Sequence, residues 1–345
     1  MRGYFLRRLL LIPATLLGIT MVVFVITRFV PGGPIERAIA ENEASSLEGG
    51  EGKSGRGVAD LGNSTALSAD QMDELKHYYG FDLPWYQSYA LWLGKIVTGD
   101  LGTSYRYNEP VWDLLKKRFP ISLFYGISTL LITYAVCIPL GILKAMKHRS
   151  LTDTVSSVIV FIGHALPGYV LGVLMIVFLA ARLRWFPMGG FVGSDFATLS
   201  PWGKALDLLH HAALPLACYL VGSFATLTFL IKNQLLDNLS ADYMRTAIAK
   251  GIPYRQAVLR HALRNSLIPL ATSAGSLFGV IFTGSFLIET IFDIDGVGLL
   301  GYSSIVDRDY PVVMGILFLS SLIFLVGNIL SDVAVALVDP RVKFS

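Results

Sequence analysis

Six long runs of apolar residues constrain the fold of this 345-residue chain more than any other feature of its sequence. An α-helix rises about 1.5 Å per residue, so roughly 20 residues cross a hydrocarbon core about 30 Å thick. The runs that reach this length are 9–27, 119–143, 154–181, 212–231, 266–288 and 311–331. Charged residues make up 15% of the chain, against about 25% in soluble domains. The chain is therefore predicted to be an all-α integral membrane protein with six transmembrane helices.

The first run has one alternative, a cleaved signal peptide, because Arg2, Arg7 and Arg8 precede it. The run is longer than the apolar core of most signal peptides, and no Ala-x-Ala-like cleavage site follows it. We therefore expect run 9–27 to remain in the protein as a transmembrane helix.

The distribution of charge predicts the orientation of these helices. If both termini are cytoplasmic, the inner segments hold 14 of the 28 Lys and Arg residues but only 5 of the 25 acidic residues. Cytoplasmic loops of membrane proteins carry an excess of Lys and Arg. This orientation places segment 232–265, which contains six basic residues, on the cytoplasmic side.

The chain is expected to divide into four parts. These are residues 1–30, the N-terminal tail and first transmembrane helix; 31–118, an extracytoplasmic helical insertion; 119–335, a five-helix transmembrane core that includes the cytoplasmic loop 232–265; and 336–345, a cytoplasmic tail. Within the insertion, Gly, Ser and Glu dominate residues 41–63, and two short amphipathic helices follow. The first is expected to run from Ser68 to Gly80, and the second to begin at Leu83 and Pro84. Aromatic residues expected at the membrane boundary are Tyr86, Tyr89, Trp92 and Trp112.

No motif for covalent chemistry is present in the sequence. The stretch LEGGEGKS ends as a phosphate-binding loop does, but Leu47 stands where that loop requires glycine. Neither a His-Glu-x-x-His zinc motif nor a Gly-x-Ser-x-Gly elbow occurs. Cys137 and Cys218 lie in apolar runs and are expected to be buried, without a disulfide or a metal. The chain is therefore predicted to be non-catalytic, with no metal and no cofactor of its own.

A few polar residues in or near the apolar runs are candidates for a translocation path, because polar groups are costly in a membrane. They are His164, Ser273, Ser276, Thr283 and Glu289. The other interpretation of His164, and the favoured one, is a neutral side chain packed against backbone freed by Pro167. For Glu289 the two readings, a solvated charge at the end of a helix and part of an outer gate, are equally supported. Small residues in run 266–288 favour close helix packing and a wet path equally.

Segment 242–265 is predicted to form an elbow between two helices. Ser240 can cap a short helix that ends at Lys250, and Gly251 can adopt the left-handed conformation that terminates it. Pro253 is expected early in a second helix. The first helix would present Tyr243, Met244 and Ile248 among basic residues. From these residues alone, insertion into a groove on a partner protein and attraction to anionic lipid are equally supported.

This segment resembles the cytoplasmic "EAA" loop of binding-protein-dependent ABC importer permeases of the dipeptide and oligopeptide branch. The matching residues are Ala247, Ala249, Gly251, Arg264, Asn265 and Pro269, whereas Ile248 replaces an Arg that the branch often shows. Similar motifs cover nearly the whole chain: PGGP, YGFDLPW, GDLGTSY, IPLGI, GSFLIETIF, GVGLLGY, RDYPVV and LVDPR. The Gly- and Glu-rich insertion and the C-terminal tail most resemble Yej-type permeases, which import peptides and microcin C.

The resemblance implies a type I ABC importer permease (MetI-like) fold in the bacterial inner membrane. It implies four kinds of protein and ligand partner besides membrane lipid: a homologous second permease, one or two ABC ATPase chains that include the tandem fused form, a periplasmic peptide-binding protein, and the peptide itself. ATP and Mg would be bound by the ATPase, and no nucleic-acid partner is expected. The residues implied to couple to the ATPase are Asp242, Tyr243, Arg245, Thr246, Ala247, Ala249, Lys250 and Gly251.

Two other functional classes are consistent with the residues. One is a channel or receptor that does not depend on ATP, and the other, with less support, is an intramembrane protease that would recruit His164 and a serine within a span. Both classes predict that no ATPase partner binds the chain.

Overall fold

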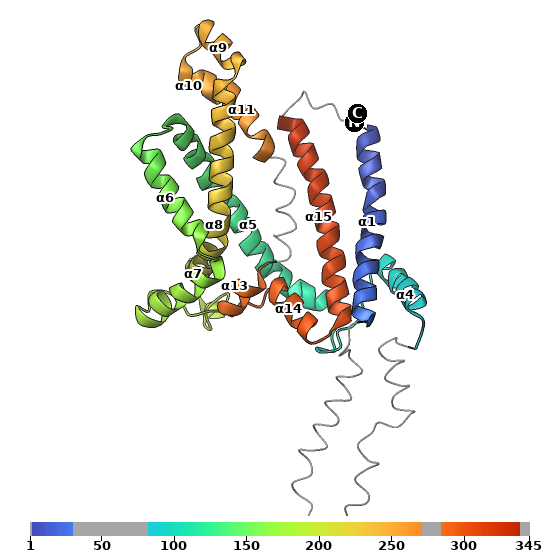
Figure 1. Ribbon diagram of the computed structural model, residues 1–345. Coiled ribbons are helices and arrows are strands. Elements are labelled where there is room, and N and C mark those ends of the chain that lie inside the picture. Colours follow the sequence, from blue (N-terminus) through green and yellow to red (C-terminus); the bar gives the residue numbers. More distant parts are fainter. Residues whose placement is uncertain (1, 30–81, 271–283, 339–345) are drawn as a thin grey trace, which may run out of the picture. The chain divides into compact units, whose positions relative to one another are not determined.

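The computed structural model of the protein describes residues 2–29, 82–270 and 284–338 (Figure 1). In these residues the regular structure is helical, apart from one isolated β-bridge between Thr103 and Pro110. Contacts group the chain into two compact units. Unit 1 comprises Met1–Pro13, Leu115–Tyr302 and Leu319–Ser345, and unit 2 comprises Ala14–Leu114 and Ser303–Phe318.

Four helices of the described part are long and apolar enough to cross a membrane. They are α1 (Arg2–Phe29), α5 (Val111–Met146), α8 (Pro201–Ser240) and α15 (Tyr310–Val338). They coincide with the first, second, fourth and sixth predicted runs. The described part therefore has four candidate spans, or five if the bent pair described next counts as one.

The third predicted run is broken into two helices. α6 (Leu151–Ala165) is followed by α7 (Gly168–Met175) and the π-helix η2 (Ile176–Arg182), and the two parts are bent by 88°. Leu166 has an extended backbone because the ring of Pro167 disfavours a helical conformation in the residue before it. A single straight third span is therefore not formed.

The fifth predicted run lies mostly outside the described residues. Its two ends are visible as α11 (Leu263–Ser266) and α13 (Phe286–Ile291). The Gly- and Glu-rich segment 41–63 and the helix predicted from Ser68 to Gly80 also lie outside the described residues.

Unit 2 contains α4 (Trp85–Val97), which begins directly after Pro84 as predicted. Tyr89 of α4 is buried, and its hydroxyl lies 2.9 Å from Thr20 Oγ1 and donates to the carbonyl oxygen of Leu17 at 3.0 Å. The hydroxyl of Tyr89 is therefore satisfied inside unit 2, and its position at the membrane boundary stays a prediction. Tyr86 and Trp112 are exposed.

Two motifs far apart in the sequence meet in unit 2. Asp309, directly before α15, accepts a hydrogen bond from the hydroxyl of Ser104 and from the backbone N–H groups of Tyr105 at 3.1 Å and Arg106 at 3.4 Å. Asp309 and Ser104 are both fully buried. A buried carboxylate is tolerated because donors surround it, so the GDLGTSY and RDYPVV motifs hold one turn together.

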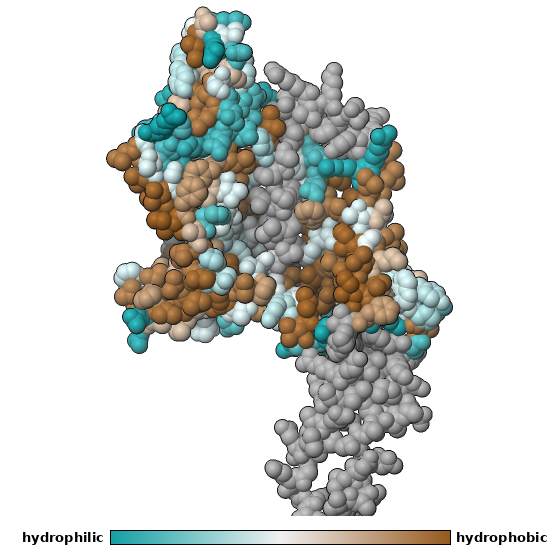
Figure 2. Space-filling model, viewed as in Figure 1, coloured by the Kyte–Doolittle hydropathy of each residue, from teal (hydrophilic) through white to brown (hydrophobic). Residues whose placement is uncertain are grey.

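Unit 1 packs α5, α6, α7 and α8 with the short helices η3 (Phe196–Thr198) and α13 and the first residues of α14 (Val297–Val306). Gly141 of α5 allows close packing, because a Cβ there would lie 2.8 Å from Ile231 of α8. Hydrophobic side chains cover the outer face of α6 and α7, whereas hydrophilic ones gather toward one end of α8 (Figure 2). An outward apolar face that covers two helices fits a lipid environment or a partner helix.

Candidate functional site

The end of α8 carries a short helix on a sharp elbow (Figure 1). α9 (Asp242–Ala249) follows α8 after one extended residue, Ala241. α10 (Tyr254–Ala257), the π-helix η4 (Val258–Ala262) and α11 then lead back toward the fifth run. Single π-helical turns such as η4 often occur at functional sites.

Gly251 ends α9 as the sequence predicted. Its φ is +84°, its N–H donates to Ile248 O at 2.9 Å, and Ile252 N–H donates to Ala247 O at 3.3 Å. These two bonds form a Schellman motif, which satisfies carbonyl groups at the end of a helix and favours glycine. Pro253 directly precedes α10, so the second helix also begins near its predicted position.

The predicted cap at Ser240 is wrong. Ser240 is the last residue of α8, and its hydroxyl donates to the carbonyl oxygen of Asp237 at 2.8 Å. Ala241 occupies the N-cap position of α9 without a side-chain hydrogen bond. The cap fails because α8 continues to Ser240, which commits its hydroxyl to the preceding helix.

One side of α9 packs on the rest of unit 1. Met244, 1% exposed, and Ala247 lie in a buried cluster with five further residues, namely Ala145, Leu235, Ala257, Val258 and Ala262. The prediction that Met244 is presented to a partner is therefore wrong, whereas Tyr243 and Ile248 are exposed. The helix is held to α5, α8 and η4 by apolar contacts rather than projecting freely.

The predicted coupling residues fall on both sides of this helix. Seven are exposed: Asp242, Tyr243, Arg245, Thr246, Ala249, Lys250 and Gly251. Ala247 is buried and belongs to the packed side. Asp242 and Arg245 lie 3.7 Å apart as a highly exposed ion pair, which contributes little to stability. The exposed face is therefore polar and available for a partner.

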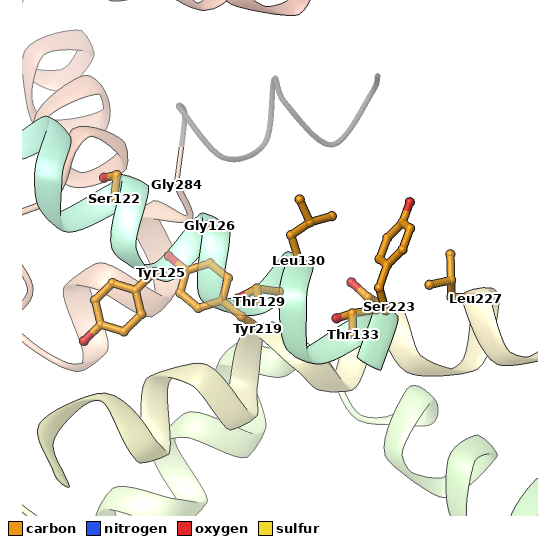
Figure 3. Close-up of a pocket in the computed structure, with 11 residues that line it drawn as sticks. Ser122, Tyr125, Gly126, Thr129, Leu130, Thr133, Tyr219, Ser223, Leu227 and Gly284 are labelled. Atoms are coloured by element: carbon orange, nitrogen blue, oxygen red, sulfur yellow. The ribbon is translucent and has the colours of Figure 1, made fainter. Parts of the chain in front are cut away.

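A second site is a cavity of about 110 Å³ between α5 and α8 (Figure 3). Hydroxyl groups line it, and they belong to Ser122, Tyr125, Thr129, Thr133, Tyr134, Tyr219 and Ser223. Leu130 and Leu227 add to a wall that is mainly apolar, and no charged residue of the described part lines the cavity. The site can therefore accept a neutral group with polar edges.

Three of these hydroxyls are unusual. The oxygens of Tyr125, Thr129 and Thr133 are buried and have no hydrogen-bond partner among the described residues. The two threonines are four residues apart, so they lie on one face of α5. A buried polar group without a partner is costly, so these hydroxyls are expected to have a reason beyond packing.

Glu289 lies beside this cavity on α13 and is 1% exposed. Its Oε2 accepts the backbone N–H of Leu299 at 2.6 Å. The cavity-lining Gly284 contacts the carboxyl group, and a Cβ on Gly296 would lie 2.6 Å from its Cδ. Burial raises the pKa of Glu289 from 4.5 to about 7, although the Leu299 N–H opposes the shift. The alternative of a solvated charge at a helix end is therefore wrong.

The predicted translocation residues lie in three kinds of place. His164 is exposed near the end of α6 and does not line the cavity. Ser273, Ser276 and Thr283 lie outside the described residues. Glu289 adjoins the cavity through Gly284. Sequence reasoning missed Thr129 and Thr133, although their four-residue spacing in an apolar run was a readable signal.

The two cysteines lie in the interior of the described part. Cys137 and Cys218 are free and buried, as predicted. Among the described residues, no group of three His, Cys, Asp or Glu side chains is arranged to hold a metal ion.

Comparison with known proteins gives consistent results. The family described as "Binding-protein-dependent transport system inner membrane component" matches residues 137–344. The chain is 38% identical to the peptidoglycan transport system permease protein YejB of Agrobacterium fabrum, covering 100% of this chain and 99% of that protein. It is also 38% identical to the inner membrane ABC transporter permease protein YejB of Escherichia coli O157:H7, with the same coverage. The oligopeptide transport system permease protein AppB of Bacillus subtilis is 33% identical over the full length of both chains.

Proposed function

The chain belongs to the family of binding-protein-dependent transport system inner membrane components, and on this premise we propose that it is the permease subunit of an ATP-driven peptide importer. Its proposed cargo class is peptides or peptide-like compounds such as microcin C. The names of the full-length relatives, which include peptidoglycan and oligopeptide permeases, support this class. Permease subunits of ABC transporters are non-catalytic, and separate ATPase subunits hydrolyse ATP.

The assembly proposed around this chain contains a homologous second permease, one or two ABC ATPase chains that bind ATP and Mg, and a periplasmic peptide-binding protein. The excess of Lys and Arg in the segments around α9 supports a cytoplasmic position for this helix and for both termini. In that orientation, α9 faces the ATPase, and α7 and α13 lie toward the periplasm.

The observation that carries the proposal is the elbow formed by α8, α9 and Gly251. α9 is exposed and polar on one side, and Met244 and Ala247 anchor the other side in the packed helices. A force on the exposed side is therefore delivered to α5 and α8. Nucleotide shifts the balance between inward-open and outward-open states only through its different affinity for the two, and α9 is the proposed carrier of that difference.

The cavity between α5 and α8 is proposed as part of the cargo path. Among the described residues, the hydroxyl groups of Thr129 and Thr133 lack a partner, and no charged side chain lines the site. Hydroxyl groups bond to peptide N–H and C=O groups of any sequence. This chemistry supports passage of peptides with different side chains.

Purification in mild detergent from its own host tests the assignment. The proposal predicts that a second permease and an ATPase accompany the chain. The double variant Arg245→Glu, Lys250→Glu should lose the ATPase and keep the second permease. Lys204→Glu, at the opposite end of α8, is the matched charge-reversal control and should retain both. Recovery of the wild-type chain without any ATPase would instead favour a channel, receptor or protease.

A further inference from the structure

Three charged side chains meet inside unit 1, one from each of three helices. They are Lys144 of α5, Asp153 of α6 and Lys232 of α8, and they are 1%, 5% and 9% exposed. We call them the ion triad. Charged side chains are rarely buried this deeply unless they are paired.

The geometry of the ion triad is directional. Lys232 Nζ donates to both carboxylate oxygens of Asp153 at 2.8 Å. Lys144 Nζ lies 3.1 Å from Asp153 Oδ1 and donates to the Asp153 carbonyl oxygen at 2.9 Å. It also donates to the hydroxyls of Ser156 at 2.9 Å and Ser157 at 2.6 Å. Lys144 is therefore anchored to three residues in the first two turns of α6.

The ion triad contains two positive charges and one negative charge. The aromatic ring of Phe229 partly compensates the excess positive charge, because its centroid lies 5.1 Å from Lys144 Nζ and 5.9 Å from Lys232 Nζ. His148 lies at the edge, with Nδ1 3.5 Å from Asp153 Oδ2, and the Arg149 N–H donates to the same oxygen at 3.2 Å. Replacing a buried ion network by apolar residues often leaves stability unchanged, so stability alone does not account for such a cluster.

The position of the ion triad relates it to α9. Ala145, next to Lys144, and Leu235, three residues after Lys232, both belong to the cluster that buries Met244 of α9. α6 has no residue in that cluster, and the ion triad ties its first turns to α5 and α8. Beyond the 88° bend, Gly172 of α7 packs against Phe292, three residues after Glu289. The chain of contacts thus runs from α9 through the ion triad to the opposite end of unit 1.

We infer that Asp153 is a positioning residue that fixes the register of α6 against α5 and α8, so that a displacement of α9 is transmitted through α6 to α7 and α13. This inference rests on the proposed function as an ATP-driven permease. The hydrogen bonds of Lys232 and the ion pair of Lys144 to one carboxylate resist sliding and rotation between helices, in addition to the apolar packing around them. Register is the best-supported use of buried polar groups in proteins.

The test compares the apolar triple variant Lys144→Met, Asp153→Leu, Lys232→Met with the wild type in the complete complex, reconstituted in lipid vesicles. The triple variant should assemble and hydrolyse ATP near the wild-type rate. The peptide transported per ATP hydrolysed should fall about tenfold, the size of a typical coupling between two sites. Lys147→Met, an exposed lysine one turn from Lys144, is the control and should transport normally.

A second variant keeps all three charges. Ser156→Ala, Ser157→Ala removes two acceptors of Lys144 and should lower transport per ATP without loss of assembly. Spin labels at Val158 of α6 and Asn233 of α8 report the register directly, and their distance distribution should broaden in both variants. Normal transport per ATP with an unchanged distance distribution would overturn the inference. Absence of ATP-driven uptake by the wild-type complex would refute the proposed function, and the distance measurement would still test the ion triad.

Discussion

Ile252 donates its backbone N–H to the carbonyl oxygen of Ala247 at 3.3 Å, across a glycine whose φ is +84°. This bond closes the end of α9 and turns the chain toward α10. No atom lies within 4 Å of the position that a Cβ on Gly251 would take, so the demand for glycine is conformational and not steric.

Gly251→Val should therefore uncouple the permease. A β-branched residue disfavours positive φ, at a cost of about 1–2 kcal/mol in this region. We expect normal abundance in the membrane and loss of ATP-dependent peptide uptake. Gly251→Asn is the matched control, because Asn tolerates the left-handed conformation. Uptake by the valine variant at the wild-type rate would show that the elbow does not transmit force.

Variants at Met244 and Ile248 test separately how α9 packs on unit 1 and how it binds the ATPase. Met244→Ala removes a buried side chain, and such changes cost about 2–5 kcal/mol. Hydrogen exchange in α9 of the isolated permease should accelerate in this variant. Ile248→Ala changes an exposed residue, so exchange should stay normal while ATPase co-purification weakens. The same response from both variants would contradict the two-sided description of α9.

Thr129 and Thr133 provide a test of the cargo path. The double variant Thr129→Val, Thr133→Val keeps the side-chain shape and removes two buried hydroxyls without partners. Thermal stability should be unchanged or higher, because the cost of burying these groups disappears. The apparent KM for peptide uptake should rise. The control is Thr228→Val, which changes a buried threonine of α8 outside the cavity lining. An unchanged KM in the double variant would show that the cavity is not part of the cargo path.

The buried carboxyl group of Glu289 should make the stability of the protein depend on pH. Burial raises its pKa from 4.5 to about 7 in the folded protein, so the folded state favours the protonated form. The stabilisation is fully present below pH 4.5 and is lost as the pH rises to about 7. Glu289→Gln should flatten this part of the Tm profile of the purified permease. Asp195→Asn, an exposed carboxylate, should leave the profile unchanged. An identical slope in Glu289→Gln and the wild type would assign the dependence to other groups.

Local features were predictable because local physics decides them. The length of the apolar runs predicted the positions of α1, α5, α8 and α15. Proline is favoured at the start of a helix, which explains why α4 begins directly after Pro84. Gly251 was identifiable because few other residues adopt its φ. The match to the permease family across nearly the whole chain was also readable from short motifs.

Features that join distant segments were not predictable from one sequence. Met244 looked like a partner contact because the sequence does not show that η4, α5 and α8 surround it. Asp153 and Lys232 are 79 residues apart, and each resembled an ordinary charge at a membrane boundary. The sequence around Glu289 did not show that glycines and a backbone N–H group enclose its carboxyl group.

The sequence by itself determined which segments are apolar helices, where α9 ends, and which family the chain resembles. The tertiary structure alone decided which face of α9 is buried, which charges meet between helices, and which hydroxyls are left without a partner among the described residues. The physical reason is that helix formation depends on neighbours within a few residues. Burial and pairing depend on which helices the fold brings together.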